Sequence, residues 1–198
     1  SIANIALGAF AKLGGVPWIV GGKDSHQDLI IGVGSAHLYD PATREKTRSI
    51  GFAACFSARG EFRFVSIARF AQSREEYLGE LKNVVSSSLT AAEELGGNVA
   101  SLTVHVPKEM GRDEAQAIKT AVTSHQAKHL PYINVIKITD EENFFAVDQS
   151  TPEGIPRRGT VIHVSDDDYL LYTEGKEEKL SWRQRIPTAL RVSPQSPM

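Results

Sequence analysis

The chain has 198 residues, of which 41% are hydrophobic and 23% charged, a balance that suits one globular domain with a sizeable core. Its formal net charge of −2 gives no sign of a surface that is basic throughout, so any nucleic-acid binding would need a local basic groove. The single cysteine, Cys55, excludes an internal disulfide framework, and its apolar neighbours predict a small buried side chain. No segment has the length and apolarity of a membrane span, and no signal-peptide pattern is present, so we expect a cytoplasmic protein.

The first predicted element is a helix over residues 2–13, whose apolar residues recur at helical spacing. Gly14 and Gly15 follow at once and supply the left-handed conformation that often ends a helix. A short extended piece at residues 16–20 and a loop at residues 21–27 come next.

Three strands are predicted after this loop. Residues 28–34 begin with Asp28 and continue as an apolar run, typical of a strand that is buried on both faces of a sheet. Residues 50–58 and 61–71 flank Arg59-Gly60, a two-residue hairpin signal, so we expect these two strands to pair.

Helices and strands alternate in the rest of the chain. A long helix begins at about Ser73, whose hydroxyl would form a capping box with Glu76. The later predicted elements are a strand at 99–106, a helix over about 112–127, a strand at 132–139 paired with 143–148, and strands at 160–164 and 169–175. This order is RNase H-like and predicts an α/β fold, a mixed sheet flanked by helices, with 28–34 between 50–58 and a parallel 99–106.

Several charged residues are candidates for chemistry. Lys12, in the last turn of the first helix, could face the helix dipole or could contact a phosphate. Arg157 and Arg158 lie in a loop beside a glycine, where two arginines together could meet a nucleic-acid backbone. The run 166–168 is three aspartates, but consecutive side chains cannot all point one way, so we interpret it as a solvated turn. The six histidines show no zinc-like pairing, and no phosphate loop, dinucleotide fingerprint or nucleophile elbow is present.

The stretch 4-NIALGAFAKLGGVPWIV-20 resembles the beginning of the PIWI domain of prokaryotic Argonaute proteins, where a helix ending Lys-Leu-Gly-Gly precedes a Pro-Trp strand. The segments 156-PRRGTVIHV-164 and 169-YLLYTEG-175 resemble late strands of bacterial members. The resemblance covers nearly the whole chain. It implies that residues 1–20 are an opening helix and strand that link to a preceding MID domain. Residues 21–198 would then be the RNase H-like PIWI domain, truncated at its C-terminus.

The slicing members of this family cut a target strand with two metal ions, which several carboxylates must hold. The resemblance places Gly34 where the family has its first aspartate and Pro107 where it has its second. The glutamate could match Glu75 or Glu76, and the fourth ligand would lie beyond Met198. Because neither glycine nor proline can coordinate a metal, we expect no slicer activity, no catalytic residue and no metal or other cofactor for catalysis.

Without slicer activity, the function that the resemblance still implies is binding of a guide strand and its target, RNA or DNA. Lys12 matches a family lysine that helps the MID domain to hold the guide's 5′-phosphate, and a Mg²⁺ ion at that phosphate is compatible with this in the full-length protein. Arg191 would match an arginine that touches guide phosphates, and Arg157 and Arg158 complete the candidate nucleic-acid-binding set. The family also implies an effector protein as partner, in defence against invading DNA.

Two other hypotheses stay open at this stage. The first is an active RNase H-like metal-dependent endonuclease with displaced ligands, for which Asp40 and Asp113 are candidates. The second is an α/β domain that binds no nucleic acid and carries Lys-Leu-Gly-Gly by coincidence. The sequence decides neither the identity of guide and target nor that of the effector.

Overall fold

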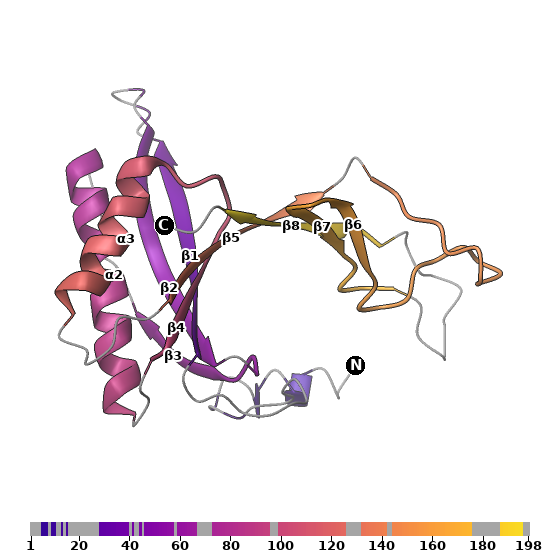
Figure 1. Ribbon diagram of the computed structural model, residues 1–198, viewed down its shortest axis with the longest axis horizontal. Helices are drawn as coiled ribbons and strands as arrows, with labels where there is room; N and C mark the ends of the chain where they lie inside the picture. The colour runs from indigo at the N-terminus through magenta and orange to yellow at the C-terminus, as the bar shows by residue number, and fades with distance from the viewer. Residues whose placement is uncertain are drawn as a thin grey trace. The chain divides into compact units, whose positions relative to one another are not determined.

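The computed structural model describes residues 5–7, 9–10, 13, 15, 28–39, 41, 44, 46–57, 59–66, 73–95, 99–125, 132–141, 144–175 and 187–195, with the backbone alone for 35–39 and 46–52. The strands in the described ranges are β1 (Asp28–Tyr39), β2 (Lys46–Ser57), β3 (Phe62–Ser66), β4 (Ser101–Val106), β5 (Tyr132–Glu141), β6 (Val161–Ser165), β7 (Asp168–Leu171) and β8 (Ala189–Gln195) (Figure 1). The helices are α2 (Arg74–Glu94) and α3 (Arg112–Ser124). Residues 5–7 and 9–10 are also helical, in agreement with the first predicted helix, whereas the predicted strand 16–20 lies outside the described residues.

The strands form a mixed sheet with the hydrogen-bonded order β3-β2-β1-β4-β5-β8-β7-β6. β1 lies between β2 and β4, which confirms the predicted internal position of the apolar strand. The chain divides into two compact units. Unit 1 contains residues 1–104, 110–133 and 198, and unit 2 contains residues 105–109 and 134–197.

In unit 1, β1 pairs with β2 in the antiparallel direction over a longer stretch than the sequence predicted. The pairing continues past Gly34 to Tyr39, with a register shift between Gly34 and Ser35. The sequence predicted a strand that ends at Gly34, but an irregularity of this kind lets a strand bend without ending. The predicted strand therefore ended too early, and β2 likewise begins at Lys46 instead of residue 50.

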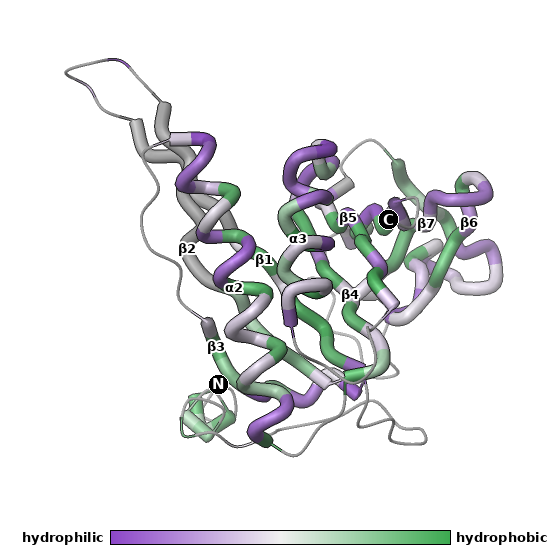
Figure 2. The backbone as a smooth tube through the Cα atoms, turned by 60° about the vertical axis from the view of Figure 1, so that its left-hand side comes forward, coloured by the Kyte–Doolittle hydropathy of each residue, from purple (hydrophilic) through white to green (hydrophobic). Residues whose placement is uncertain are grey.

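α2 begins where the sequence indicated. The Ser73 side chain accepts a hydrogen bond from the Glu76 backbone N–H at 3.1 Å, which satisfies one of the unpaired donors of the first turn. The buried residues of α2 recur at helical spacing and are Tyr77, Leu81, Val84, Val85, Ser88 and Leu89. α2 and α3 lie side by side, and each alternates between apolar and hydrophilic stretches along its length (Figures 1 and 2).

The core of unit 1 forms where α2 and α3 cover the strands. Leu81 and Leu89 of α2 are buried, as are Leu102 of β4 and Ile118 of α3, and each contributes about 1.5–3 kcal/mol relative to an exposed side chain. Cys55 is buried and free, as predicted, and its thiol donates to Ser88 Oγ at 3.4 Å. Burial raises the pKa of this thiol, although the hydrogen bond to Ser88 lowers it in part.

Unit 2 corrects two predictions. β5 pairs with β8 in the antiparallel direction, not with residues 143–148. Residues 144–148 form no strand, and the Ala146 N–H donates to the hydroxyl of buried Tyr172 at 3.0 Å. β8 extends to Gln195. Proline is disfavoured within a strand because it donates no ladder hydrogen bond, but Pro194 stands next to the end of β8 and is exposed.

Candidate nucleic-acid interface

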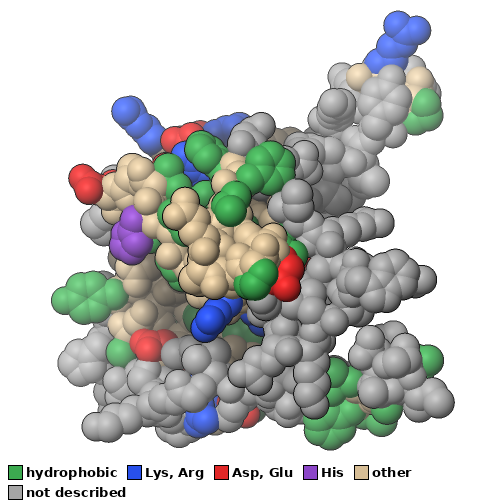
Figure 3. Space-filling view, turned by 90° about the vertical axis from the view of Figure 1, so that its right-hand side faces the viewer, with side chains coloured by type: hydrophobic (Ala, Val, Ile, Leu, Met, Phe, Trp, Pro, Cys, Tyr) green, Lys and Arg blue, Asp and Glu red, His purple; other side chains and the backbone are tan. Residues whose placement is uncertain are grey.

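The predicted nucleic-acid-binding residues do not all lie in the described ranges. Lys12 and residues 16–20 fall outside them. Arg157, Arg158 and Arg191 are described, and all three belong to unit 2. Figure 3 is a space-filling view in which both basic and apolar side chains are exposed. Among the described residues of unit 2, the large apolar side chains that are exposed are Phe144, Phe145, Val147, Val161 and Val164.

Arg157 and Arg158 are exposed side chains on a tightly bonded turn. The Arg157 carbonyl accepts from the Thr160 backbone N–H at 3.1 Å and from the Thr160 hydroxyl at 2.7 Å. The Gly159 N–H donates to the Tyr172 carbonyl at 2.7 Å, and Gly159 has φ +81°, which glycine adopts without strain. The sequence predicted a loop here. The hydrogen bond from Gly159 joins the backbone of this loop to Tyr172, the residue that follows β7.

Gly175 packs against the backbone of the same turn. A Cβ atom at this position would lie 2.3 Å from the Pro156 carbonyl oxygen and 2.7 Å from the Arg158 nitrogen. No side chain can fit against backbone at such distances, so the absence of a Cβ is what allows the two segments to approach. Gly175 therefore positions the backbone that carries Arg157 and Arg158.

Replacing Gly175 with alanine should displace the 156–158 backbone and destabilise the fold by about 1–3 kcal/mol, the usual range for overpacking. Thermal or denaturant unfolding measures the loss, and nucleic-acid binding measures the displacement of the arginines. Gly79→Ala is the matched control, because nothing lies within 4 Å of its added Cβ and alanine favours a helix. Equal stability of the two variants would contradict the positioning role of Gly175.

Arg191 lies on β8 and is paired within the protein. Its Nη2 donates to Asp168 Oδ2 at 2.8 Å and its Nε to Asp168 Oδ1 at 3.4 Å, so the guanidinium meets the carboxylate through two nitrogens. The Ser193 hydroxyl donates to the same Asp168 Oδ1. The Arg191 and Asp168 side chains are 33% and 25% exposed, so the pair is half-buried but accessible.

The hydrogen bond from Arg191, followed by that from Ser193, lowers the pKa of Asp168 from 3.8 to about 2. A folded-state pKa below the unfolded value means that the pair stabilises the fold fully above pH 3.8 and loses this contribution as the pH falls toward about 2. Asp168 is therefore a carboxylate throughout the neutral range.

The interpretation of the 166–168 run as a solvated turn was correct for Asp166 and Asp167, which are exposed and join β6 to β7. It was wrong for Asp168, which opens β7 and binds Arg191 and Ser193. The sequence offered one unused signal. Arg191 and Ser193 are two residues apart, and in a strand such residues point to the same face.

The positions that the resemblance matches to the slicer ligands lie in β1, after β4 and in the first turn of α2. Gly34 is a half-buried residue of β1 at the register shift, and Pro107 is exposed directly after β4. Glu75 and Glu76 are exposed in the first turn of α2. Within the described residues, no three His, Cys, Asp or Glu side chains come close enough to hold a metal ion together.

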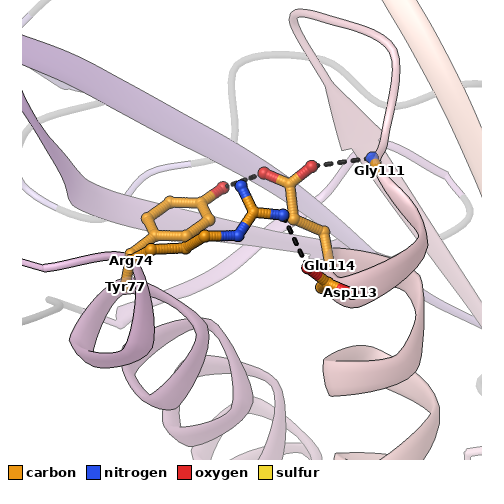
Figure 4. Close-up of polar contacts among 5 residues, drawn as sticks. All are labelled: Arg74, Tyr77, Gly111, Asp113 and Glu114. Atoms are coloured by element: carbon orange, nitrogen blue, oxygen red, sulfur yellow. Dashed lines mark hydrogen bonds and ion pairs between the residues drawn. The ribbon is translucent and has the colours of Figure 1, made fainter.

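Asp113, one of the two candidate displaced ligands, is engaged at the start of α3 (Figure 4). Its Oδ2 accepts from Arg74 Nη2 at 2.7 Å, an exposed pair that contributes little to stability. Glu114 beside it is buried and accepts from the Tyr77 hydroxyl at 2.7 Å and from the Gly111 N–H at 2.8 Å. These contacts link α3 to α2. Asp40, the other candidate, lies outside the described residues.

Comparison with known protein families matches the Piwi domain over residues 1–179. The Argonaute protein of Cereibacter sphaeroides is 24% identical over 216 residues, which cover 98% of this chain and 27% of that protein. A structure of Aquifex aeolicus Argonaute superposes with a TM-score of 0.64 at 18% identity, over 98% of this chain and 26% of that one.

A structure of Marinitoga piezophila Argonaute in complex with 5′ OH guide RNA and target DNA superposes with a TM-score of 0.62 at 12% identity, over 89% of this chain and 24% of that one. The chain thus spans about a quarter of the length of these relatives. The structural likeness agrees with the RNase H-like fold predicted from the order of strands and helices. No helix in the described ranges is long and apolar enough to cross a membrane.

Proposed function

The chain belongs to the Piwi domain family, and from this premise we propose that it is a guide-dependent nucleic-acid-binding module of a prokaryotic Argonaute that lacks slicer activity. The observation that carries the proposal is a pair of residues on two strands that are neighbours in the sheet: Gly34 within β1, at its register shift, and Pro107 directly after β4. A two-metal site needs carboxylates to hold hard cations, and neither residue offers an oxygen side chain.

The binding half of the proposal is supported by the solved relative from Marinitoga piezophila, which holds guide RNA and target DNA. In this chain, the residues proposed to contact nucleic acid are Lys12, Arg157, Arg158 and Arg191. Arginine and lysine suit this role because phosphate contacts supply most of the affinity for nucleic acid. A net charge of −2 is compatible with it if these cations are concentrated along the bound strand.

In the complete protein, a MID domain would complete the pocket for the guide's 5′-phosphate, where Lys12 and a Mg²⁺ ion would neutralise charge. We further propose a cytoplasmic location and an effector protein that acts in host defence once a target is bound. The alternative is an active nuclease with displaced ligands, in which Asp113 would have to leave its exposed ion pair with Arg74.

Sequencing the nucleic acids that co-purify with the full-length protein tests the binding function. We expect short strands of narrow length distribution, and we expect the loaded protein to bind complementary targets at least a hundredfold more tightly than scrambled ones, a difference of about 2.7 kcal/mol. Equal affinity for complementary and scrambled targets would reject guide dependence. Absence of any bound nucleic acid, together with failure to load synthetic guides, would reject the function altogether.

A further inference from the structure

Four polar side chains share one face of three neighbouring strands in unit 2. Ser193 of β8 stands directly opposite Lys137 of β5 in the antiparallel register, so their side chains lie on the same face. Arg191 lies on this face as well, because it is two residues from Ser193 in the same strand. Asp168 of β7 joins them by accepting from both Arg191 and Ser193. We call Lys137, Asp168, Arg191 and Ser193 the β5-β8-β7 cluster.

The cluster has an ordered arrangement of charge. Ser193 is only 8% exposed and fixes one carboxylate oxygen of Asp168, while Arg191 binds both oxygens through two nitrogens. Lys137 lies on β5, on the other side of β8 from Asp168, and is near enough to Asp168 to favour its ionised form. The cluster contains two cations and one anion, on side chains that are partly exposed.

We propose that the β5-β8-β7 cluster is a binding site for a nucleic-acid backbone phosphate, in which Arg191 and Lys137 contact the phosphate and Asp168 is a positioning residue. This inference rests on the proposed function. A long arginine side chain loses rotamer freedom when it binds, and a guanidinium already held by a carboxylate has lost part of that freedom before the phosphate arrives. Ser193 contributes indirectly, because its hydrogen bond orients the Asp168 carboxylate that binds Arg191.

A positioning role and a purely electrostatic role of Asp168 predict opposite effects on binding. Replacing Asp168 with asparagine removes a negative charge beside the bound phosphate, so simple Coulomb attraction predicts tighter binding. Positioning predicts the opposite, because the amide no longer forms a charge-assisted pair with Arg191. We expect Asp168→Asn to weaken binding about threefold to tenfold, the scale of one arginine side chain that must be ordered on binding.

The experiment measures the affinity of the full-length protein for guide alone and for guide plus target across a series of salt concentrations. Asp167→Asn is the matched control, since it removes the same charge from the exposed neighbouring position and should leave affinity unchanged or slightly tighter. Lys137→Gln should weaken binding and reduce the slope of log affinity against log salt by about one, the signature of a lost phosphate contact. If the slope changes with guide alone, the guide strand supplies the phosphate. If it changes only with guide plus target, the target strand supplies it.

Asp168→Glu keeps the carboxylate and should recover part of the affinity that asparagine loses, which a purely electrostatic role would not produce. Binding by Asp168→Asn as tight as that of the wild type, or tighter, would overturn the positioning role. If Asp168→Asn fails to fold, an unchanged salt slope for Lys137→Gln would overturn the site by itself. If wild-type protein binds no nucleic acid, the proposed function fails too, whereas wild-type binding with unaffected variants rejects this inference alone.

Discussion

A complementary target strand should remain intact when the full-length protein is loaded with guide and supplied with Mg²⁺ or Mn²⁺. Two metal ions roughly 4 Å apart must clamp the attacking and leaving oxygens, and several carboxylates are needed to hold them. Gly34 and Pro107, at the places that the family resemblance assigns to two of these carboxylates, supply no ligand atom. Target binding must be confirmed in the same reaction, so that an intact strand reflects absent chemistry and not an absent complex.

Two variants test the expected absence of cleavage. Gly34→Asp alone should not start cleavage, because one restored carboxylate cannot build a two-metal site. A metal-dependent product cut at a single position opposite the guide, and lost when Glu76 is replaced by alanine, would show that displaced ligands support catalysis. That result would restore the active-nuclease hypothesis.

Replacing Lys12 with alanine should weaken binding of a 5′-phosphorylated guide by roughly tenfold to a hundredfold in the full-length protein. A lysine that contacts a phosphate makes a charge-assisted hydrogen bond, which contributes about 1.5–3 kcal/mol. Direct titration of labelled guide measures the effect. The fold should change little, because a lysine near a helix C-terminus contributes only about 0.3–1 kcal/mol through the dipole.

The control for Lys12 is a guide with a 5′-hydroxyl. The loss should shrink sharply with this guide, since the phosphate that Lys12 would contact is absent from both measurements. Equal weakening of both guides would show that Lys12 acts through general charge or through structure, and the phosphate role would then be abandoned.

Local signals in the sequence determined the elements that depend on neighbouring residues. Ser73 predicted the start of α2 because a hydroxyl at this position satisfies the N–H of a residue only three positions away. The apolar run that follows Asp28 predicted a strand inside the sheet, because such a strand needs cover on both faces. Cys55 was predicted to be buried from its apolar neighbours alone.

Tertiary structure decided the features that join residues far apart in the chain. β5 pairs with β8, more than 45 residues later, where sequence reasoning chose the nearer segment 143–148. The sequence alone does not distinguish Gly175 from other turn glycines, because its close contact with the backbone of Pro156 arises only in the folded chain. Asp168 looked like one acid of a solvated run, and only the pairing of β7 with β8 brings it to Arg191. Hydrophobic and turn patterns report what a residue does within a few positions, whereas strand register is set by the sheet as a whole.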